Sequence, residues 1–523
     1  MKKHLLRILS LILCFSCLFS FVACGKDGGD GTTAPSGTTA EPSDPKDPSK
    51  TPLSDLDFGG DRLIISVSAN QDSEVTFRPA DIYTRGPATY GAAQGDEVQQ
   101  MVFNRNKKIK DDLGLNVVFK DTNLAYSEVL EDIGKIMQGG STEIPDIYIN
   151  DVYGLARAML NGYLFNLKRT DQSNYLDLAA DCWYQDYMEG LSFSDDKQYI
   201  LAGDYFIDMI RMAWVFYVNS TLLEERFSGS SFGYDIDWIY EQVEFGEWDY
   251  YLLKTISKAA FDESGGNTPN TEDEKDACLG LIWPHVFGFV MAPSSGLTIL
   301  EKNEKTGELH ITKDTSDLFV FSEGLKELYE TDGVYWRNNV LDSTTYFMKG
   351  NILFAFSVLG EMESTQMREL GFSKGVVPFP KYDYTLQEDY NTVCHDQSEV
   401  GAILASTACF DAATAYLQLS CEQSRSIMIE YFEDSLKLKY SEDLGTQKSL
   451  DIIRDSICSP MEIITLNALG VIVDGEGIGI GTIVKEVAMG TSDGGFIARY
   501  DAVKEAFDVR LQKGLKDYWE PLK

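Results

Sequence analysis

Three polar side chains of this sequence stand directly after short predicted strands, where they could bind a ligand. Asn150 and Asp151 follow the strand predicted at residues 146–149, and Glu361 comes directly after Gly360, at the end of the strand predicted at residues 351–358. In an open α/β sheet, ligands bind beyond the carboxyl ends of the strands. Carboxylate and amide groups exchange hydrogen bonds with polar ligands. The pattern therefore favours a binding site for a polar molecule.

Asp151 also has a structural explanation. An Asp directly before a helix accepts hydrogen bonds from backbone N–H groups of the first turn. Residues 152–161 read as such a helix, and Gly162 ends it. Helix capping and ligand contact are therefore both open for Asp151.

The elements that must position these residues alternate between strand and helix patterns. Strands are predicted at residues 63–67, 115–119, 146–149, 351–358 and 374–379, and helices at residues 96–113, 127–137, 152–161 and 362–370. Such alternation is typical of a mostly parallel sheet covered by helices. We therefore predict an α/β fold.

Catalytic motifs have little support in this sequence. Residues 229–233, Gly-Ser-Ser-Phe-Gly, match the GxSxG pattern, but residues 222–227 look helical and a nucleophile elbow requires a strand there. Neither HExxH nor GxxxxGK[ST] occurs in the sequence. With 82 acidic residues, paired carboxylates carry no information, because almost any fold brings some together. We predict no enzyme, with a secreted glycosidase as the alternative.

The charge balance excludes some partners. The chain has 82 Asp and Glu against 45 Lys and Arg, for a net charge of −37. Nucleic-acid affinity comes largely from basic side chains that neutralise phosphates, so this excess disfavours nucleic acid and anionic membrane surfaces. Attachment to a membrane would have to be covalent or hydrophobic.

Metal sites and cofactors are not expected. Residues 262–273 resemble a calcium loop in composition, but Asn267 stands where an EF-hand loop needs Gly. Beyond the first 24 residues no pair of cysteines forms CxxC, so we expect buried free thiols rather than a metal site or a disulfide scaffold. These cysteines are Cys182, Cys278, Cys394, Cys409, Cys421 and Cys458.

The N-terminus has the pattern of a lipoprotein signal. Residues 1–23 combine a basic start with an apolar stretch, and Phe-Val-Ala-Cys-Gly around Cys24 looks like a lipoprotein signal-peptidase site. We predict that residues 1–23 are removed and that Cys24 carries lipid; an ordinary signal peptide cut near Ala23 is the alternative. Residues 24–57 are rich in Gly, Ser, Thr, Pro and Asp and predict a flexible tether.

Two stretches carry a resemblance to a known family. Residues 347–381 contain Phe-x-x-Gly-x-x-Leu-Phe, a Glu, Arg-Glu-Leu and Gly-Val-Val-Pro-Phe-Pro-Lys, and residues 144–167 contain Pro-Asp-Ile followed by Gly-x-Leu-x-x-Leu. Together they resemble the bacterial extracellular solute-binding proteins of family 1, lipid-anchored receptors of ABC importers that are distantly like maltose-binding protein. The resemblance extends over residues 60–455.

The resemblance implies a two-lobed periplasmic-binding-protein type II fold. Each lobe would be a mixed sheet covered by helices, with hinge crossings between the lobes. Residues 58–203 plus 348–425 would form the first lobe, and residues 204–347 plus 426–523 the second.

Further ligand contacts follow from the resemblance. Residues 197–219 look like the family's crossing into the second lobe, which would place Asp204 and Tyr205 near the cleft. Sugar-binding members carry an aromatic near the position of Trp283, where an indole face suits the C–H groups of a sugar; a core Trp is the alternative. The expected ligand contacts are Asn150, Asp151, Asp204, Tyr205, Trp283 and Glu361.

The implied function is capture of an extracellular carbohydrate or oligosaccharide by lobe closure and its delivery to an ABC permease. The protein would act as a monomer, held by the lipid on Cys24 at the extracellular face of the bacterial cytoplasmic membrane. A secreted enzyme and a peptide-binding receptor or adhesin are the alternatives.

Overall fold

The computed structural model describes most of the chain beyond residue 50. The described residues are 51–68, 81–89, 96–122, 124, 128–140, 143–169, 171–192, 196–230, 233–261, 279–284, 287–297, 300–302, 309–311, 315–337, 340–458, 471–473, 476–478, 480–490 and 495–519. The predicted signal peptide, Cys24, Cys278 and the calcium-like loop at residues 262–273 lie outside them.

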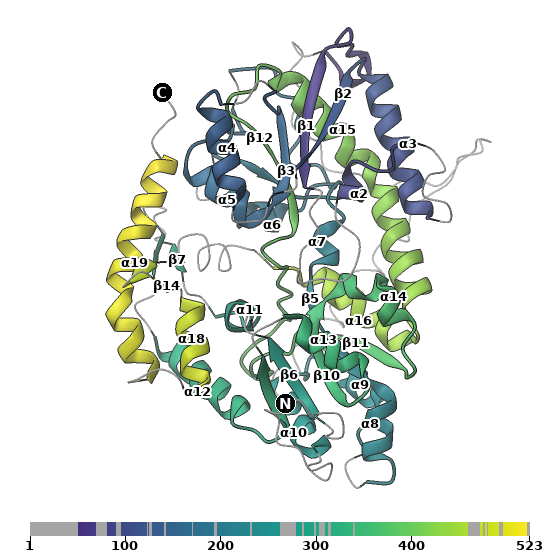
Figure 1. Ribbon diagram of the computed structural model, residues 1–523, viewed down its shortest axis with the longest axis vertical. Coiled ribbons are helices and arrows are strands. Elements are labelled where there is room, and N and C mark those ends of the chain that lie inside the picture. The colour runs from purple at the N-terminus through teal and green to yellow at the C-terminus, as the bar shows by residue number, and fades with distance from the viewer. Residues whose placement is uncertain are drawn as a thin grey trace, which may run out of the picture. The chain divides into compact units, whose positions relative to one another are not determined.

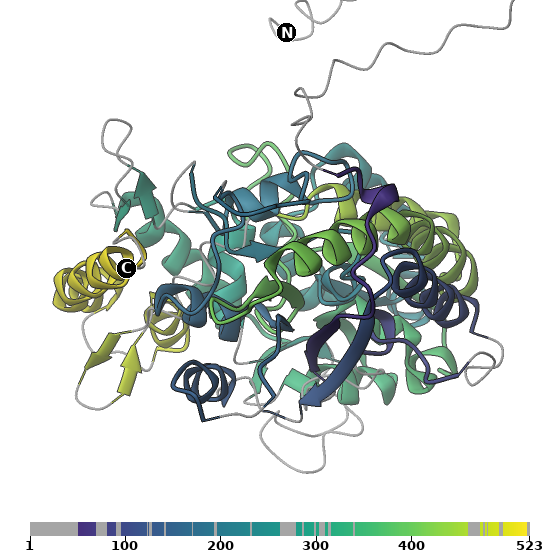
Figure 2. The same cartoon turned by 90° about the horizontal axis from the view of Figure 1, so that it is seen from above.

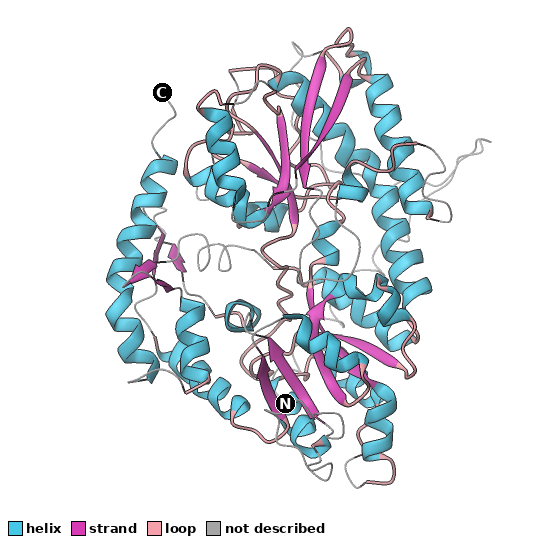
Figure 3. Ribbon diagram, viewed as in Figure 1, coloured by secondary structure: helices cyan, strands magenta, loops and turns pink. Residues whose placement is uncertain are grey.

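Two five-stranded sheets organise the described chain (Figures 1 and 3). The first sheet has the order β2 (Asn116–Thr122), β1 (Arg62–Ser68), β3 (Ile147–Asp151), β12 (Glu399–Ile403) and β4 (Ile200–Leu201). The second has the order β11 (Lys374–Pro378), β5 (Trp214–Asn219), β10 (Ile352–Val358), β6 (Leu279–Pro284) and β9 (Val334–Arg337). Two short hairpins add β7 (Leu300–Lys302) with β8 (Leu309–Ile311) and β13 (Val471–Val473) with β14 (Glu476–Ile478).

Helices surround both sheets. The α-helices are α2 (Asp81–Thr84), α3 (Glu97–Asp112), α4 (Val129–Met137), α5 (Val152–Leu160), α6 (Gln185–Glu189), α7 (Asp208–Arg211), α8 (Ser220–Phe227), α9 (Ile236–Phe245), α10 (Tyr250–Ala260), α11 (Phe287–Ser294), α12 (Ser316–Tyr329), α13 (Val340–Met348), α14 (Thr365–Arg368), α15 (Phe410–Ile429), α16 (Leu444–Asp455), α18 (Ile480–Ala488) and α19 (Gly495–Trp519). Short 3₁₀ turns are η1 (Leu53–Asp55) and η4 (Leu359–Glu363), and η5 (Glu430–Tyr440) is a π-helix.

Both sheets are mixed, as expected. In the first, β1 pairs in parallel with β2 and β3, and β12 runs antiparallel to β3. In the second, β5 is antiparallel to β10 and β11, whereas β10, β6 and β9 are parallel. Strand β10 is buried at every position, which explains its continuous apolar run. The predicted α/β fold is confirmed.

Helices cover the two faces of the first sheet. Helix α3 packs against α15, and α4 packs against α5, which also contacts β3 and β12. Figure 1 shows the first pair on one side of the sheet and the second pair on the other. Over the second sheet, α16 packs on β11, and α13 packs on β10 and β6.

The described chain passes between the sheets three times. It goes from β4 to β5 through α7, from β11 to β12, and from α15 directly into η5. Figure 2 shows α15 lying along the first sheet before it continues into η5. The predicted crossing at residues 197–219 is the first of these passages.

The predicted division of the chain into two lobes is wrong for two strands. Residues 348–425 were expected in the first lobe as a whole, but β10 and β11 both pair with β5 in the second sheet. Only β12 and α15 join the first sheet and its helices. A buried apolar run has the same pattern in either sheet, so it specifies a strand without specifying its partners.

The C-terminal helices contact elements that accompany both sheets. Helix α18 packs against α11 and α12, and α19 packs against α5, α18 and β8. None of the helices among the described residues is long and apolar enough to span a membrane.

Candidate functional site

Asn150 and Asp151 end strand β3, as expected, and both are buried. The Asn150 Oδ1 accepts a hydrogen bond from the Asp151 backbone N–H at 2.8 Å, and its Nδ2 has no hydrogen-bond partner among the described residues. Asp151 caps α5, because its Oδ1 accepts from the Gly154 N–H at 2.6 Å. Asn150 thus keeps a buried donor for another group, whereas Asp151 has a structural task.

Asp204 follows the first sheet at the start of the crossing toward β5, and its carboxylate contacts two side chains. Its Oδ1 accepts from the Tyr184 hydroxyl at 3.0 Å, and its Oδ2 lies 3.2 Å from Nη1 of Arg425. Burial raises the pKa of Asp204, while Arg425 and Tyr184 act in the opposite direction. These contacts fasten the crossing to α15 and give both oxygens partners within the protein.

Tyr205 is fully buried. The Arg105 guanidinium lies 4.6 Å from the centre of the Tyr205 ring, and the ring of Phe206 packs against it edge-on. In this arrangement the side chain belongs to the core of the first sheet. Its predicted ligand contact stays a prediction.

Trp283 lies in a strand of the second sheet, and Glu361 lies in the 3₁₀ turn that follows another strand of that sheet. Glu361 is in η4, directly after β10, and is fully buried. The backbone of Trp283 lies in β6 opposite Trp336 of β9, and its side chain is outside the described part of the chain. The structure therefore brings Asn150 and Asp151 together, with the other predicted contacts on different elements.

A buried ionic cluster at the crossings was not predicted from the sequence. Arg211 on α7 donates to Glu363 through Nε at 2.9 Å and through Nη2 at 3.3 Å, and to Asp208 through Nη1 at 3.0 Å. The Arg211 side chain has no exposed surface. Glu363 stands two residues beyond the predicted Glu361. The sequence shows two nearby acidic residues, Glu361 and Glu363. It does not show which of the two carboxylates contacts an arginine.

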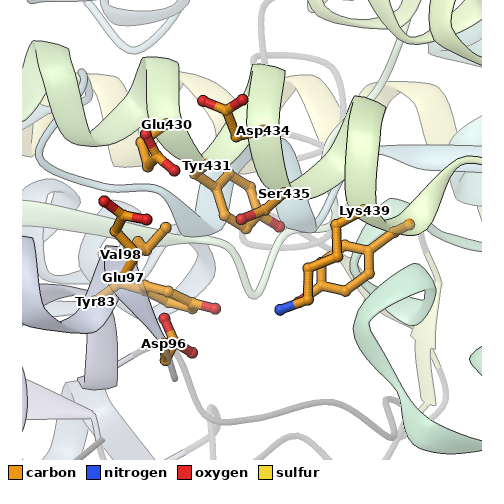
Figure 4. A pocket seen from close by; sticks show the side chains of 10 residues that line it. Tyr83, Asp96, Glu97, Val98, Glu430, Tyr431, Asp434, Ser435 and Lys439 are labelled. Carbon is orange, nitrogen blue, oxygen red and sulfur yellow. The ribbon is translucent and has the colours of Figure 1, made fainter. Parts of the chain in front are cut away.

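A polar pocket of about 270 Å³ lies beside this cluster (Figure 4). One wall comes from α2 and the start of α3, and the other comes from η5. It is lined by Tyr83, Asp96, Glu97, Val98, Glu430, Tyr431, Asp434, Ser435, Lys439 and Tyr440. None of the ligand contacts expected from the sequence is in this lining.

The pocket combines acidic groups with aromatic rings. Figure 4 shows the Lys439 amine pointing into the space between the two walls. Burial raises the pKa of Glu430, and the nearby carboxylates of Asp434 and Glu97 raise it further. Carboxylates, an amine and tyrosine rings suit a hydroxylated organic molecule, through hydrogen bonds and ring contacts.

The GxSxG match does not have the structure of a nucleophile elbow. The expected helix before the GxSxG match is present as α8, so this sequence lacks the strand that a nucleophile elbow needs. Ser231 itself lies outside the described residues. Tyr217 and Asn219, which match the family's Tyr-x-Asn pattern, have structural roles: the Tyr217 hydroxyl donates to the Val358 carbonyl, and Asn219 caps α8.

Comparison with solved structures shows that other proteins share this architecture. The chain superposes on the cyclic alpha-maltosyl-1,6-maltose binding protein of Arthrobacter globiformis with a TM-score of 0.53 and 12% identity, covering 87% of this chain and 100% of that one. The chain has the two-lobed fold of the solute-binding proteins. An uncharacterized protein from Listeria monocytogenes gives a TM-score of 0.52 and 13% identity over 86% of this chain and 100% of that one.

Sequence comparison adds nothing to this result. No protein-family model matches the chain, and no curated protein matches it. The solute-binding fold therefore rests on the arrangement of elements, which the short motifs of the sequence had indicated.

Proposed function

We propose that this protein is the substrate-binding component of an ABC importer and captures an extracellular carbohydrate or oligosaccharide by closure of two lobes. The observation that carries the proposal is the pair of mixed sheets joined by three crossings. Crossings of this kind let two rigid bodies rotate about a few connecting residues. A ligand that contacts both bodies then stabilises the closed form, which the importer recognises.

Two observations support a carbohydrate as the ligand. Asn150 has a buried donor at the carboxyl end of β3, the edge where α/β sheets bind ligands. A sugar hydroxyl is an acceptor that satisfies such a donor. The name of the Arthrobacter protein, which shares the fold, is that of a binding protein for a cyclic oligosaccharide.

Membrane attachment belongs to the same proposal. Lipid on Cys24 would hold the protein at the extracellular face of the bacterial cytoplasmic membrane. The predicted tether of residues 24–57 would be shorter at its end, because η1 is folded and Leu53 and Leu56 pack against the core. The folded part would then act as a monomer beside the permease and carry out no chemistry on its ligand.

The ligand class is tested by the thermal stability of the protein with a panel of oligosaccharides and a panel of peptides. We expect a rise in Tm with oligosaccharides, because a ligand that binds only the folded state stabilises it. A rise in Tm with peptides alone would show that the ligand is a peptide and not a carbohydrate. Release of reducing sugar from the same oligosaccharides would instead identify an enzyme.

Two variants locate the site once a saccharide is found. Asn150→Ala is expected to weaken its binding, and Glu430→Gln is expected to leave it unchanged, because Glu430 lines the separate pocket beside η5. If Glu430→Gln weakens binding and Asn150→Ala does not, the saccharide binds in the pocket beside η5. The ligand class is then unchanged.

A further inference from the structure

The carboxylate of Glu363 is a meeting point for elements of both lobes. Glu363 lies at the end of η4, which follows β10 of the second sheet. Tyr83 lies in α2, which packs on β1 of the first sheet and on α3. The Tyr83 hydroxyl donates to Oε2 of Glu363 at 3.4 Å, so this contact joins one lobe to the other.

All three crossings reach the same cluster. Arg211, on the first crossing, forms the paired contact with Glu363 and also binds Asp208. The other oxygen of Asp208 accepts from the backbone N–H of Glu399, where the second crossing enters β12. Tyr431, on the third crossing, donates its hydroxyl to Oε1 of Glu363.

The contacts in this cluster differ in strength. The Arg211 guanidinium holds Glu363 in a two-pronged, charge-assisted contact with a shortest distance of 2.9 Å. The Tyr83 hydroxyl lies 3.4 Å from Oε2, beyond the range of about 2.5 to 3.0 Å that is usual for O–H···O hydrogen bonds, so this contact is the weaker one. If the lobes separate, the Tyr83–Glu363 contact breaks at a lower cost than the Arg211–Glu363 contact. Arg211 and Glu363 can then remain in contact at the crossings.

The contact between Tyr83 and Glu363 lies in a largely apolar environment. Tyr83 packs in one apolar cluster with Val98 and Val102 of α3, Ile210 of the first crossing and Met362 of η4. The ring of Tyr83 lies 4.6 Å from the Arg211 guanidinium. In such an apolar environment a hydrogen bond is stronger than it is in water, so the contact favours the lobe arrangement seen here.

We propose that Tyr83 and Glu363 form a latch between the lobes, and that Arg211 holds the carboxylate in position for it. The latch stabilises one relative orientation of the lobes and thereby sets how readily they move. Its effect on solute affinity rests on the proposed function, but its effect on lobe orientation does not.

The test measures the distance between the lobes without any ligand. Spin labels are attached through a ketone-bearing amino acid at the exposed positions of Lys107 on α3 and Lys258 on α10, in the full chain. Pulsed electron paramagnetic resonance then gives the distribution of distances between the two labels. Tyr83→Phe removes the hydroxyl and keeps the ring, and we expect the balance between lobe orientations to change about two- to tenfold, the effect of one hydrogen bond.

Tyr240→Phe is the matched control. The Tyr240 hydroxyl also donates to a carboxylate, that of Asp443, at 3.1 Å, but α9 and α16 both accompany the second sheet. This variant should keep the wild-type distances. Glu363→Gln, which also weakens the latch, should shift them in the same direction as Tyr83→Phe.

The latch is refuted if Tyr83→Phe, folded by circular dichroism, keeps the wild-type distribution, or if Tyr240→Phe shifts it equally. Neither outcome depends on the carbohydrate. A failure of the saccharide panel with a shifted Tyr83→Phe distribution would therefore leave the latch standing and remove only the proposed ligand.

Discussion

Two asparagines show how similar residues at the end of a strand can have different tasks. Asn150 ends β3 before α5, and Asn219 ends β5 before α8. Asn219 uses both side-chain groups: its Oδ1 accepts from the Leu222 N–H at 2.9 Å, and its Nδ2 donates to the Gly350 carbonyl at 3.2 Å. The Nδ2 of Asn150 has no such partner among the described residues. Only Asn150 therefore has a donor to offer to a ligand.

We expect Asn150→Ala to weaken saccharide binding by about 1 to 3 kcal/mol, because a buried polar contact to the ligand is lost. Isothermal titration calorimetry with the saccharide found in the thermal panel measures the change. Asn219→Ala is the control: it should lower the free energy of unfolding by about 0.5 to 2 kcal/mol through the lost helix cap and leave affinity unchanged. Wild-type affinity in Asn150→Ala would exclude this residue from the site.

The buried Asp204 predicts a particular pH dependence. Burial raises its pKa above the ordinary value of 3.8. The folded state therefore holds this proton to higher pH than the unfolded state, and the resulting stabilisation is present at low pH and lost as pH rises through the folded pKa. Asp204→Asn has no such titration. Its free energy of unfolding relative to wild type should increase between about pH 4 and about pH 7, measured by urea unfolding.

Asp171→Asn is the control for this sign. Asp171 is exposed, and its hydrogen bond with Arg169 lowers its pKa. For this variant, the free energy of unfolding relative to wild type should therefore fall as pH rises toward and through the ordinary carboxyl pKa of 3.8, and should change little above it. Equal trends in the two variants would contradict the role of burial at Asp204.

At the scale of elements, the passage from β4 to β5 is closely packed. Gly203 forms a bridge with Trp183 just before α7. A Cβ at Gly203 would lie 2.3 Å from the Cys182 carbonyl oxygen and 2.8 Å from the Cys421 Sγ. Only glycine fits at this place.

Gly203→Ala should therefore lower the free energy of unfolding by about 1 to 3 kcal/mol, the usual cost of overpacking. Denaturant unfolding measures it. Gly371→Ala serves as the control, because nothing lies within 4 Å of a Cβ there. A loss of stability at Gly371 as large as that at Gly203 would show that packing at the crossing is not the cause.

The ionic cluster gives a second prediction for the hinge elements. Arg211→Met leaves Asp208 and Glu363 buried without their cation, so the free energy of unfolding should fall by about 3 to 5 kcal/mol. Arg454→Met removes exposed ion pairs to Glu433 and Asp451 and should cost about 0 to 1 kcal/mol. Thermal and urea unfolding compare the two. Similar losses would mean that Arg211 is not desolvated as described.

The sequence predicted elements better than it predicted their partners. The patterns around residues 63–67, 115–119 and 351–358 are observed as β1, β2 and β10, because alternation and apolar runs act locally. The sheet to which β10 belongs depends on pairing with the distant β5, which no local pattern encodes. The same applies to Arg211, whose partner Glu363 lies 152 residues away.

For the candidate site, the sequence placed Asn150 and Asp151 correctly at the end of a strand, because strand ends are readable locally. It could not tell that Asp204 would be held by Arg425 and Tyr184, since those contacts depend on how α15 packs. The pocket beside η5 was missed for the same reason: its walls meet only through the fold.

At the scale of the whole molecule, lobe closure requires the two sheets to behave as separate bodies. The first sheet carries α3, α4, α5 and α15, and the second carries α10, α13 and α16. Three crossings and the cluster around Glu363 connect them. The excess of acidic over basic side chains, 82 against 45, favours an uncharged or cationic solute over an anionic one.

Closure of these lobes on a carbohydrate would change the distance between spin labels at Lys107 and Lys258. That distance is measured before and after addition of the oligosaccharide that gives the largest rise in Tm. We expect a single distribution at a changed distance in the saturated protein, with a population that follows the binding isotherm. An unchanged distribution at saturation would show binding without closure and would contradict this expectation.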